Sequence, residues 1–207
     1  MRAALVLAGG LSRRMGKPKQ FLDFRGTPLI ARVASRLAKA VDEVVVAINR
    51  GDNEVIYKQH LPESTLIVKD EVDIQAPLVG FCSGLKPVKS PYTFVTSCDA
   101  PFVNPKVVDE LFRRVEGADA ALPIWPNGIL EPLHAVYHTT RTLDAACRCV
   151  EAGRFKNLSI LNYFRDVRYV NVEELRNLDP ELLTFFNINT VEDYQHALKL
   201  AYTIDGG

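Results

Sequence analysis

The chain has 207 residues, which is enough for one α/β domain with a full hydrophobic core. Its 25 basic and 25 acidic residues cancel, so we expect neither a nucleic-acid partner nor a membrane partner. No apolar stretch approaches membrane-spanning length, and the first residues lack a signal-peptide cleavage site. The four cysteines show no zinc-binding spacing. We therefore expect one domain over residues 1–207, with reduced thiols and a cytoplasmic location.

An apolar run followed by a basic loop opens the chain. Residues 3–8 have the length and composition of a strand that is buried on both faces. Gly9 and Gly10 follow it, and glycines let backbone N–H groups approach a ligand closely. Cations then neutralise phosphate charge. The segment predicts a phosphate site, with a solvated basic turn as the alternative. The cations are Arg13, Arg14, Lys17 and Lys19.

The two common phosphate-binding loops do not fit this segment. The dinucleotide pattern G-x-G-x-x-G is absent. The Walker A pattern places four residues between its glycines and a hydroxyl residue after its lysine. Here five residues separate Gly10 from Gly16, and Pro18 follows Lys17. Because proline has no hydroxyl to hold magnesium, this loop must bind phosphate in another way.

Strands and helices alternate along the first half of the chain, and the second half is less regular. This alternation indicates a largely parallel sheet with right-handed crossovers. The predicted strands are 3–8, 44–48, 66–68, 92–97, 118–124, 132–137, 167–172 and 185–189. The predicted helices begin at Thr27-Pro28, Pro77, Asn104-Pro105 and Thr190, with a further helix around 143–150.

Polar residues follow three of the predicted strands. Asn49, Asp70 and Asp99 each stand where a strand ends, and ligands of such sheets bind beyond the carboxyl ends of the strands. Asp99 is a candidate magnesium ligand that would face the phosphate loop, with a turn or cap aspartate as the alternative. Asn49 offers a donor and an acceptor, and Asp70 can accept from a ribose hydroxyl or a guanine edge. Ordinary loop residues are the alternative for these two.

The segment L-A-G-G-x-S-x-R-M-G-x-x-K, over residues 7–19, resembles the signature of the molybdenum cofactor guanylyltransferases. This resemblance implies a Rossmann-like three-layer α/β sandwich with a mostly parallel sheet, as in the nucleotide-diphospho-sugar transferases. The N-terminal half would bind the nucleotide and the C-terminal half the acceptor. The resemblance covers nearly the whole chain, through further blocks at 77–80, 98–101, 131–135 and 186–193.

The resemblance also implies roles for single residues. Arg14, Lys19 and Asp99 would be catalytic, with Asp99 holding Mg²⁺. Asn187 and Asn189 would share one face of a strand, and two amides there suit a pterin acceptor, with turn-forming amides before a helix as the alternative. Arg154 could contact a second substrate phosphate, with a solvated arginine as the alternative. His134 is interpreted as a packed strand residue. The nucleotide-binding set would be Leu7, Ala8, Gly9, Gly10, Ser12, Lys19, Asn49, Asp70 and Asp99.

Two positions depart from the family pattern. Ala76 stands where a glycine is usual, before Pro77-Leu78-Val79-Gly80, so the pocket there is expected to differ slightly. Val191 stands where proline is usual, but Thr190 can still cap the helix that follows.

The implied activity is a magnesium-dependent transfer of GMP from GTP to the terminal phosphate of molybdopterin or molybdenum-molybdopterin. The attacking phosphate is already an anion, so the reaction needs no general base. Three alternatives stay open: cytidylyl transfer to the same pterin, sugar-phosphate nucleotidylyl transfer, and a GTP-binding module without turnover. Further implied partners are other cofactor-biosynthesis proteins and the molybdoenzymes that accept the product.

Gly9 is a candidate for base selection. Related cytidylyltransferases tend to have L-A-A-G where this chain has L-A-G-G over residues 7–10. Because glycine has no Cβ, it leaves room at the strand end for the larger purine. We hypothesise that Gly9 helps the chain to prefer GTP over CTP.

Overall fold

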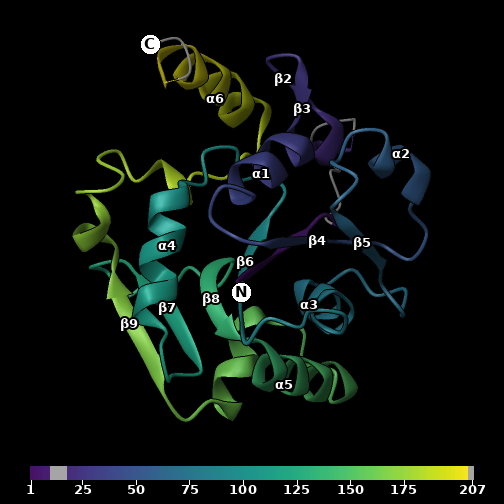
Figure 1. Ribbon diagram of the computed structural model, residues 1–207, viewed down its shortest axis with the longest axis vertical. Coiled ribbons are helices and arrows are strands. Elements are labelled where there is room, and N and C mark those ends of the chain that lie inside the picture. The colour runs from purple at the N-terminus through teal and green to yellow at the C-terminus, as the bar shows by residue number, and fades with distance from the viewer. Residues whose placement is uncertain (10–17, 205–207) are drawn as a thin grey trace.

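The computed structural model describes residues 1–9 and 18–204. Its main feature is a seven-stranded sheet in the order β5-β4-β1-β6-β8-β7-β9 (Figure 1). Strand β8 runs antiparallel to both of its neighbours, and all other adjacent strands are parallel. The expected mostly parallel α/β sheet is therefore confirmed. These strands are β1 (Ala3–Leu7), β4 (Glu43–Ile48), β5 (Leu66–Lys69), β6 (Tyr92–Ser97), β7 (Ala120–Ile124), β8 (His134–His138) and β9 (Val167–Asn171).

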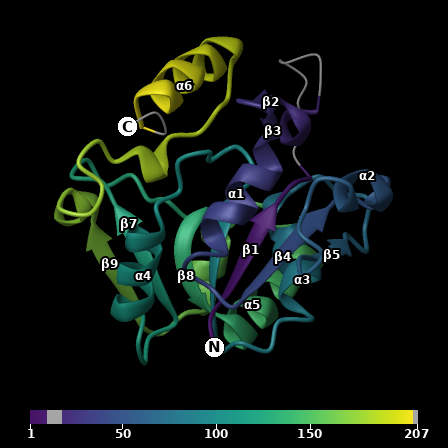
Figure 2. The same cartoon turned by 45° about the horizontal axis from the view of Figure 1, so that its top comes forward.

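Helices cover both faces of the sheet (Figures 1 and 2). Alternate residues of β1 point to opposite faces: Ala4 and Val6 pack with α1 and α4, whereas Ala3 and Leu5 pack with α3 and α5. Every residue of β1 is buried, as the continuous apolar run predicted. The helices are α1 (Leu29–Leu37), α2 (Glu54–Lys58), α3 (Pro77–Leu85), α4 (Pro105–Arg114), α5 (Thr139–Glu151) and α6 (Val191–Ile204).

Two glycines of α3 let this helix lie close against the sheet. A Cβ at Gly80 would meet Leu7 Cδ2 at 2.8 Å, and a Cβ at Gly84 would collide with the side chain of Leu5. The amino-terminal end of α3 is thereby fixed beside the end of β1. Its first residues can then form a wall above the strand ends.

The predicted helix start at Thr27-Pro28 is wrong. These residues form β3 (Thr27–Pro28), which pairs with β2 (Asp23–Phe24), and α1 begins at Leu29. The reason lies in the two residues between the strands: Arg25 and Gly26 both have positive φ, at 58° and 80°. Two such residues make the tight turn of a β-hairpin. Thr27 and Pro28 pair with β2 in this hairpin, so they are not part of the helix.

The predicted strand at 185–189 is also wrong. A 3₁₀ turn covers Leu183–Phe185, and the following residues pair with no strand. The backbone N–H of Ile188 donates instead to the carbonyl of Asp99 at 2.9 Å. This hydrogen bond holds the segment across the end of β6. The segment therefore does not run alongside the sheet as a further strand.

Helix α6 begins with the predicted cap. Thr190 Oγ1 accepts from the backbone N–H of Asp193 at 3.1 Å, and Asp193 Oδ2 accepts from the N–H of Thr190 at 2.8 Å. These reciprocal bonds make a capping box, so valine replaces the usual proline at 191 without loss of the cap. Helix α6 then packs against the β2–β3 hairpin through Phe24, Ala197 and Ala201.

The described part of the chain, residues 1–9 and 18–204, contains no helix with the length and apolar character of a membrane span. All four cysteines are free thiols, in agreement with the prediction.

Candidate active site

The predicted polar residues meet at the carboxyl edge of the parallel strands. Backbone bonds extend the strand pairing into the loops: Asp70 N donates to Ile48 O at 2.8 Å, and Cys98 N donates to Leu7 O at 3.0 Å. The ends of β1, β4, β5 and β6 are thereby held in register. Convergence at one sheet edge, which was predicted from spacing, is confirmed.

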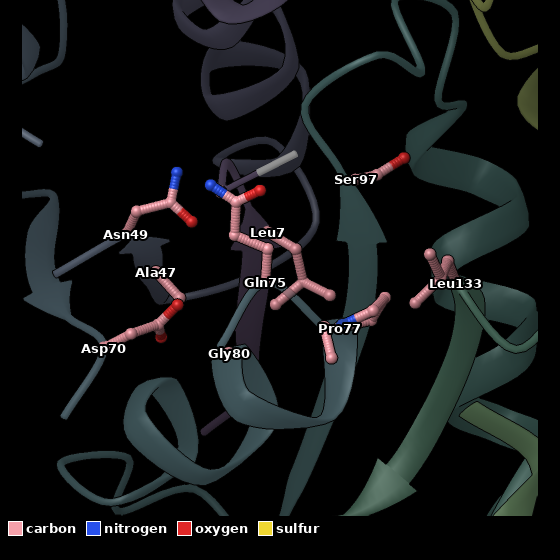
Figure 3. Close-up of a pocket in the computed structure, with 11 residues that line it drawn as sticks. Leu7, Ala47, Asn49, Asp70, Gln75, Pro77, Gly80, Ser97 and Leu133 are labelled. Carbon is pink, nitrogen blue, oxygen red and sulfur yellow. The ribbon is translucent and has the colours of Figure 1, made fainter. Parts of the chain in front are cut away.

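A pocket of about 270 Å³ opens at this edge, and we call it the strand-end pocket (Figure 3). Its apolar lining comes from Leu7, Ala47, Pro77 and Leu133. Its polar lining comes from Asn49, Asp70, Gln75 and Ser97, which project from different elements. An apolar cleft with a few convergent polar groups is the usual form of a small-molecule site.

Asp70 brings an unpaired acceptor to this pocket. Its side chain is buried, and Oδ1 has no hydrogen-bond partner among the residues that the structure describes. Burial is the main cause that raises the pKa of the Asp70 carboxyl to about 6, and the negative charge of Asp52 contributes to the same shift. A hydrogen bond with the Ser83 side chain acts in the opposite direction and lowers the pKa, so only Oδ1 of this carboxyl is without a donor. A buried acceptor of this kind is costly unless a ligand supplies the missing donor.

Asn49 lies beside Asp70 with its amide oxygen turned toward the pocket (Figure 3). Gly9 makes this position possible, because a Cβ there would lie 2.5 Å from Asn49 Oδ1. Ala76 causes no strain, since its extended backbone, with φ of −145°, is one that alanine readily adopts.

Asp99 lies next to Ser97 and contacts Lys19, at the end of the basic loop. Lys19 Nζ donates to Asp99 Oδ2 at 2.9 Å, and Ser97 Oγ donates to Asp99 Oδ1. Both charged side chains are 17% exposed, so they are reachable yet partly shielded from water. Lys19 also reaches Asn189 Oδ1 at 3.3 Å. The structure thus joins three predicted site residues that are far apart in the sequence.

A second cleft, of about 260 Å³, begins at Asp99, and we call it the Asp99 cleft. It shares Ser97 and Leu133 with the strand-end pocket. Asn187 and Asn189 both line it, although the strand that was expected to align them is absent. Asn187 Oδ1 is buried without a hydrogen-bond partner in the described residues. The cleft therefore offers amide groups next to the carboxylate.

Glu131 and Ser97 are lining residues that the sequence did not single out. Glu131 Oε1 accepts from Trp125 Nε1 at 2.7 Å, which fixes the carboxylate at the rim of the Asp99 cleft. Ser97 stands two residues before Asp99 and is on the same side of the chain, which strand alternation could have indicated. His134 is 1% exposed and packs edge-on against Phe185, as predicted, but it also lines this cleft.

Arg154 lies apart from the two asparagines. It lines a third cleft with Gly153 and Lys156, which adjoins the strand-end pocket through Gln75, Ala76 and Pro77. The positive φ of Gly153, 68°, turns the chain sharply after α5 and sends Arg154 to this side. The predicted acceptor contacts thus lie in two different clefts, each of which adjoins the strand-end pocket. The predicted residues Gly10, Ser12, Arg14 and Lys17 lie outside the described residues.

The mostly parallel sheet, the pocket at its carboxyl edge and the neighbouring Lys19–Asp99 pair are together typical of a nucleotidyltransferase. Comparison with known proteins agrees with this class and narrows it. A family model for the MobA-like NTP transferase domain matches residues 4–162, which is more than half of the chain. The chain therefore belongs to the MobA-like NTP transferases.

Individual relatives match over nearly the full length. A probable molybdenum cofactor guanylyltransferase of Methanosarcina mazei is 38% identical over 95% of this chain and 90% of its own. A molybdenum cofactor guanylyltransferase of Desulfosudis oleivorans is 32% identical over 93% of this chain and 92% of its own. The crystal structure of molybdopterin-guanine dinucleotide biosynthesis protein A from Archaeoglobus fulgidus has a TM-score of 0.83 at 29% identity, covering 98% of this chain and 100% of that one.

A more distant structure shares the fold alone. The 2-C-methyl-D-erythritol 4-phosphate cytidylyltransferase of Thermus thermophilus has a TM-score of 0.70 at 18% identity. This likeness shows the fold alone, and the fold does not identify the nucleotide.

Proposed function

We propose that this protein transfers GMP from GTP to the terminal phosphate of molybdopterin or molybdenum-molybdopterin, giving the guanine dinucleotide cofactor and pyrophosphate. The observation that carries the proposal is the placement of two acceptor groups, Asn49 and Asp70, in a pocket next to the Lys19–Asp99 pair. The names of the full-length relatives support the same activity. Nothing in the comparisons favours the alternatives left open by the sequence.

Guanine fits the polar lining of the strand-end pocket. Its Watson–Crick edge presents adjacent N–H donors at N1 and N2, which the Asp70 carboxylate can accept together. The oxygen of Asn49 faces the same pocket and can accept the second N2 hydrogen. Cytosine presents an acceptor at N3, which would face the carboxylate oxygens. This pattern supports GTP over CTP.

Group transfer requires alignment and charge neutralisation more than proton transfer. An oxygen of the acceptor phosphate attacks the α-phosphorus of GTP, the bond to the β-phosphate oxygen breaks, and pyrophosphate leaves with the electron pair. Lys19 lies where it can offset the negative charge of the triphosphate. The backbone beyond Gly9 and the side chain of Arg14 are proposed to hold the remaining phosphates.

The residues present fit a magnesium ion. Asp99 supplies a partly shielded carboxylate, held in place by Ser97, and Mg²⁺ prefers one or two carboxylates together with phosphate oxygens. No cluster of three or more His, Cys, Asp or Glu side chains suited to a metal occurs within 1–9 and 18–204, so phosphate and water would complete the shell. When bound there, Mg²⁺ would neutralise charge on the phosphates.

The acceptor is proposed to occupy the Asp99 cleft. Asn187 and Asn189 offer amide groups that suit the heteroatoms of a pterin, and the acceptor's phosphate would then lie near Asp99. Arg154, in the cleft on the other side, stays a candidate for contact with a substrate phosphate. The cytoplasmic location and the partner proteins implied by the family also stay predictions.

One assay separates the proposal from its alternatives. Purified protein is incubated with magnesium and either GTP or CTP, with and without molybdopterin, and pyrophosphate is measured. The proposal requires pyrophosphate with GTP only when molybdopterin is present. A preference for CTP would indicate cytidylyl transfer, and turnover with a sugar phosphate in place of the pterin would indicate the third class. GTP binding without any pyrophosphate would leave a binding module.

Lys19→Ala is expected to lower turnover more than Lys17→Ala. Lys19 contacts Asp99 directly, so its loss removes a positive charge next to the proposed phosphate position. A loss of about 10²-fold for Lys19→Ala is expected, as for other groups that stabilise charge at a reaction centre. Turnover of both variants at saturating GTP and magnesium is the measurement. Greater damage from Lys17→Ala would mean that the family alignment of the loop is displaced by two residues.

Gly9→Ala is expected to shift the ratio of kcat/KM toward CTP by about 10-fold, within the usual range for one misplaced methyl group. The structure revises the reason, because the new Cβ would displace the amide of Asn49 before it reached the nucleotide. Competitive turnover of GTP and CTP, together with a melting curve, checks this. An equal fall in both activities would mean that Gly9 shapes the loop without affecting base selection.

A further inference from the structure

A hydrogen-bonded cluster lies behind Asn49, on the side of its amide nitrogen. Asp52 Oδ2 accepts from the backbone N–H of Asn49 at 3.2 Å and from Asn49 Nδ2 at 3.3 Å. The same oxygen accepts from the Tyr57 hydroxyl at 2.9 Å. Gln20 Nε2 in turn donates to the Tyr57 hydroxyl at 2.8 Å. These four residues are called the Asp52 cluster below.

The cluster fixes which end of the Asn49 amide faces the pocket. A carboxylate can only accept hydrogen bonds, so the amide nitrogen of Asn49 must point to Asp52. The amide oxygen then points the other way, against Gly9 and into the strand-end pocket (Figure 3). With Asp52 absent, the amide would be free to turn over and present two donors to the base.

Burial makes this arrangement rigid. Tyr57 is 1% exposed and Gln20 is 6% exposed, and the rings of Phe21 and Tyr57 lie 4.9 Å apart. Burial also raises the pKa of the Tyr57 phenol, so its hydroxyl remains a donor at every physiological pH. Gln20 and Phe21 belong to the turn that starts at Lys19. The Asp52 cluster therefore connects the end of the basic loop with Asn49, in the lining of the strand-end pocket.

We propose that Asp52 is a positioning residue for base recognition, which keeps Asn49 as an obligate acceptor for the 2-amino group of a guanine nucleotide. This inference rests on the proposed function, because it assumes that GTP occupies the strand-end pocket. Hypoxanthine differs from guanine only by lacking that amino group, so ITP is the matched probe. Asp52 acts on the preference between these two nucleotides through Asn49.

The test is equilibrium titration of GTP and ITP, in magnesium, into the wild type and an Asp52→Leu variant. Leucine has the branched shape of aspartate, although it is larger, and it cannot accept hydrogen bonds. The preference for GTP over ITP is expected to fall by about 3- to 10-fold, the usual effect of one neutral hydrogen bond, while ITP affinity stays within about twofold. Asp52→Asn keeps an acceptor oxygen and is expected to retain most of the preference.

Further variants separate positioning from a loss of structure. Asn53→Ala removes the neighbouring side chain that caps α2 by accepting from the N–H of Val55, so it serves as a control for stability. It is expected to lower the melting temperature without changing the preference for GTP. In an Asn49→Ala background, Asp52→Leu is expected to have no further effect on that preference, because the two residues act through one contact. Asp52→Ala, which likewise removes the acceptor for Asn49, replaces Asp52→Leu if that variant fails to fold.

The possible outcomes are distinct. Equal losses of GTP and ITP affinity in Asp52→Leu would overturn the positioning role but leave the proposed function standing. If Asp52→Leu changed only the affinity for GTP relative to 2′- or 3′-deoxy-GTP, Asn49 would contact the ribose. That result would also overturn the positioning role in base recognition. A wild type that binds CTP as tightly as GTP would instead contradict the proposed function itself.

Discussion

Asp99→Asn is expected to lower the rate of GMP transfer by about 10²–10³-fold, while the protein stays folded. The amide has the size of the carboxylate but lacks its charge, so it can neither pair with Lys19 nor hold a cation beside the triphosphate. Ser97 can still donate to the remaining oxygen, which preserves the local structure. The measurement is pyrophosphate release at saturating GTP, molybdopterin and magnesium.

Asp109→Asn provides the matched control for this experiment. Asp109 lies on α4 and pairs with Arg2 at the surface, where its side chain is 52% exposed. Removal of a surface charge of this kind is expected to leave turnover unchanged. Turnover of Asp99→Asn equal to that of the wild type would exclude Asp99 from the site. A melting curve for each variant distinguishes lost catalysis from lost folding.

The edge of the sheet was predictable because it depends on short-range patterns. Buried strands appear as apolar runs, and parallel strands place their carboxyl ends together. The sequence alone therefore predicts that Asn49, Asp70 and Asp99 lie at one site. The same reasoning could not reveal that Lys19 contacts Asp99, because the two residues are 80 positions apart and meet only through the folded sheet.

The errors arose where tertiary contacts decide the backbone. Residues 185–189 have the composition of a strand, yet the bond from Ile188 to Asp99 holds them across the strand ends. Asn187 and Asn189 still line one cleft, so the expected grouping is right although its reason was wrong. Arg154 lines a different cleft from the two asparagines, because the turn at Gly153 sends it there, and its contact with a substrate phosphate stays a prediction.

Asp52 illustrates a further limit of sequence analysis. A loop aspartate three residues after Asn49 has no distinctive pattern, and its role depends on a buried tyrosine from α2. The proposed positioning role of Asp52 thus concerns a residue that lies behind the lining of the strand-end pocket in this chain. Only its geometry identifies it.

Asp70→Asn is expected to weaken GTP binding and, at the same time, to stabilise the protein at pH 8. In the wild type, Asp70 Oδ1 is buried with no partner in the described residues, and burial raises the pKa of the carboxyl to about 6. The value in the unfolded chain is near 3.8, so the folded state holds this proton more tightly. The charged form therefore costs stability, and this cost is fully present above pH 6.

The size and the pH dependence of the stability gain follow from this difference. The pKa of Asp70 is near 3.8 in the unfolded chain and about 6 in the folded protein. This difference lowers the free energy of unfolding by at most about 3 kcal/mol. The variant is expected to gain up to this amount at pH 8, and the gain is expected to disappear below about pH 3, where the wild-type carboxyl is protonated in both the folded and the unfolded state. Thermal melts of wild type and variant between pH 3 and pH 8 measure it.

The affinity for GTP is expected to change in the opposite direction. Two donors of guanine lose a charged acceptor, which corresponds to a loss of about 10- to 10²-fold in Asp70→Asn. In the wild type, GTP affinity should also decline as the pH falls through 6, because protonation of Asp70 removes the same acceptor. The γ-phosphate of GTP titrates in this range too, so the pH dependence of the variant serves as the correction. A variant that binds GTP as the wild type does, or that is less stable at pH 8, would show that Asp70 is paired within the protein and does not read the base. The predicted opposition between stability and affinity is what distinguishes a ligand-binding carboxylate from a structural one, because only the former is left without its donors until the nucleotide arrives.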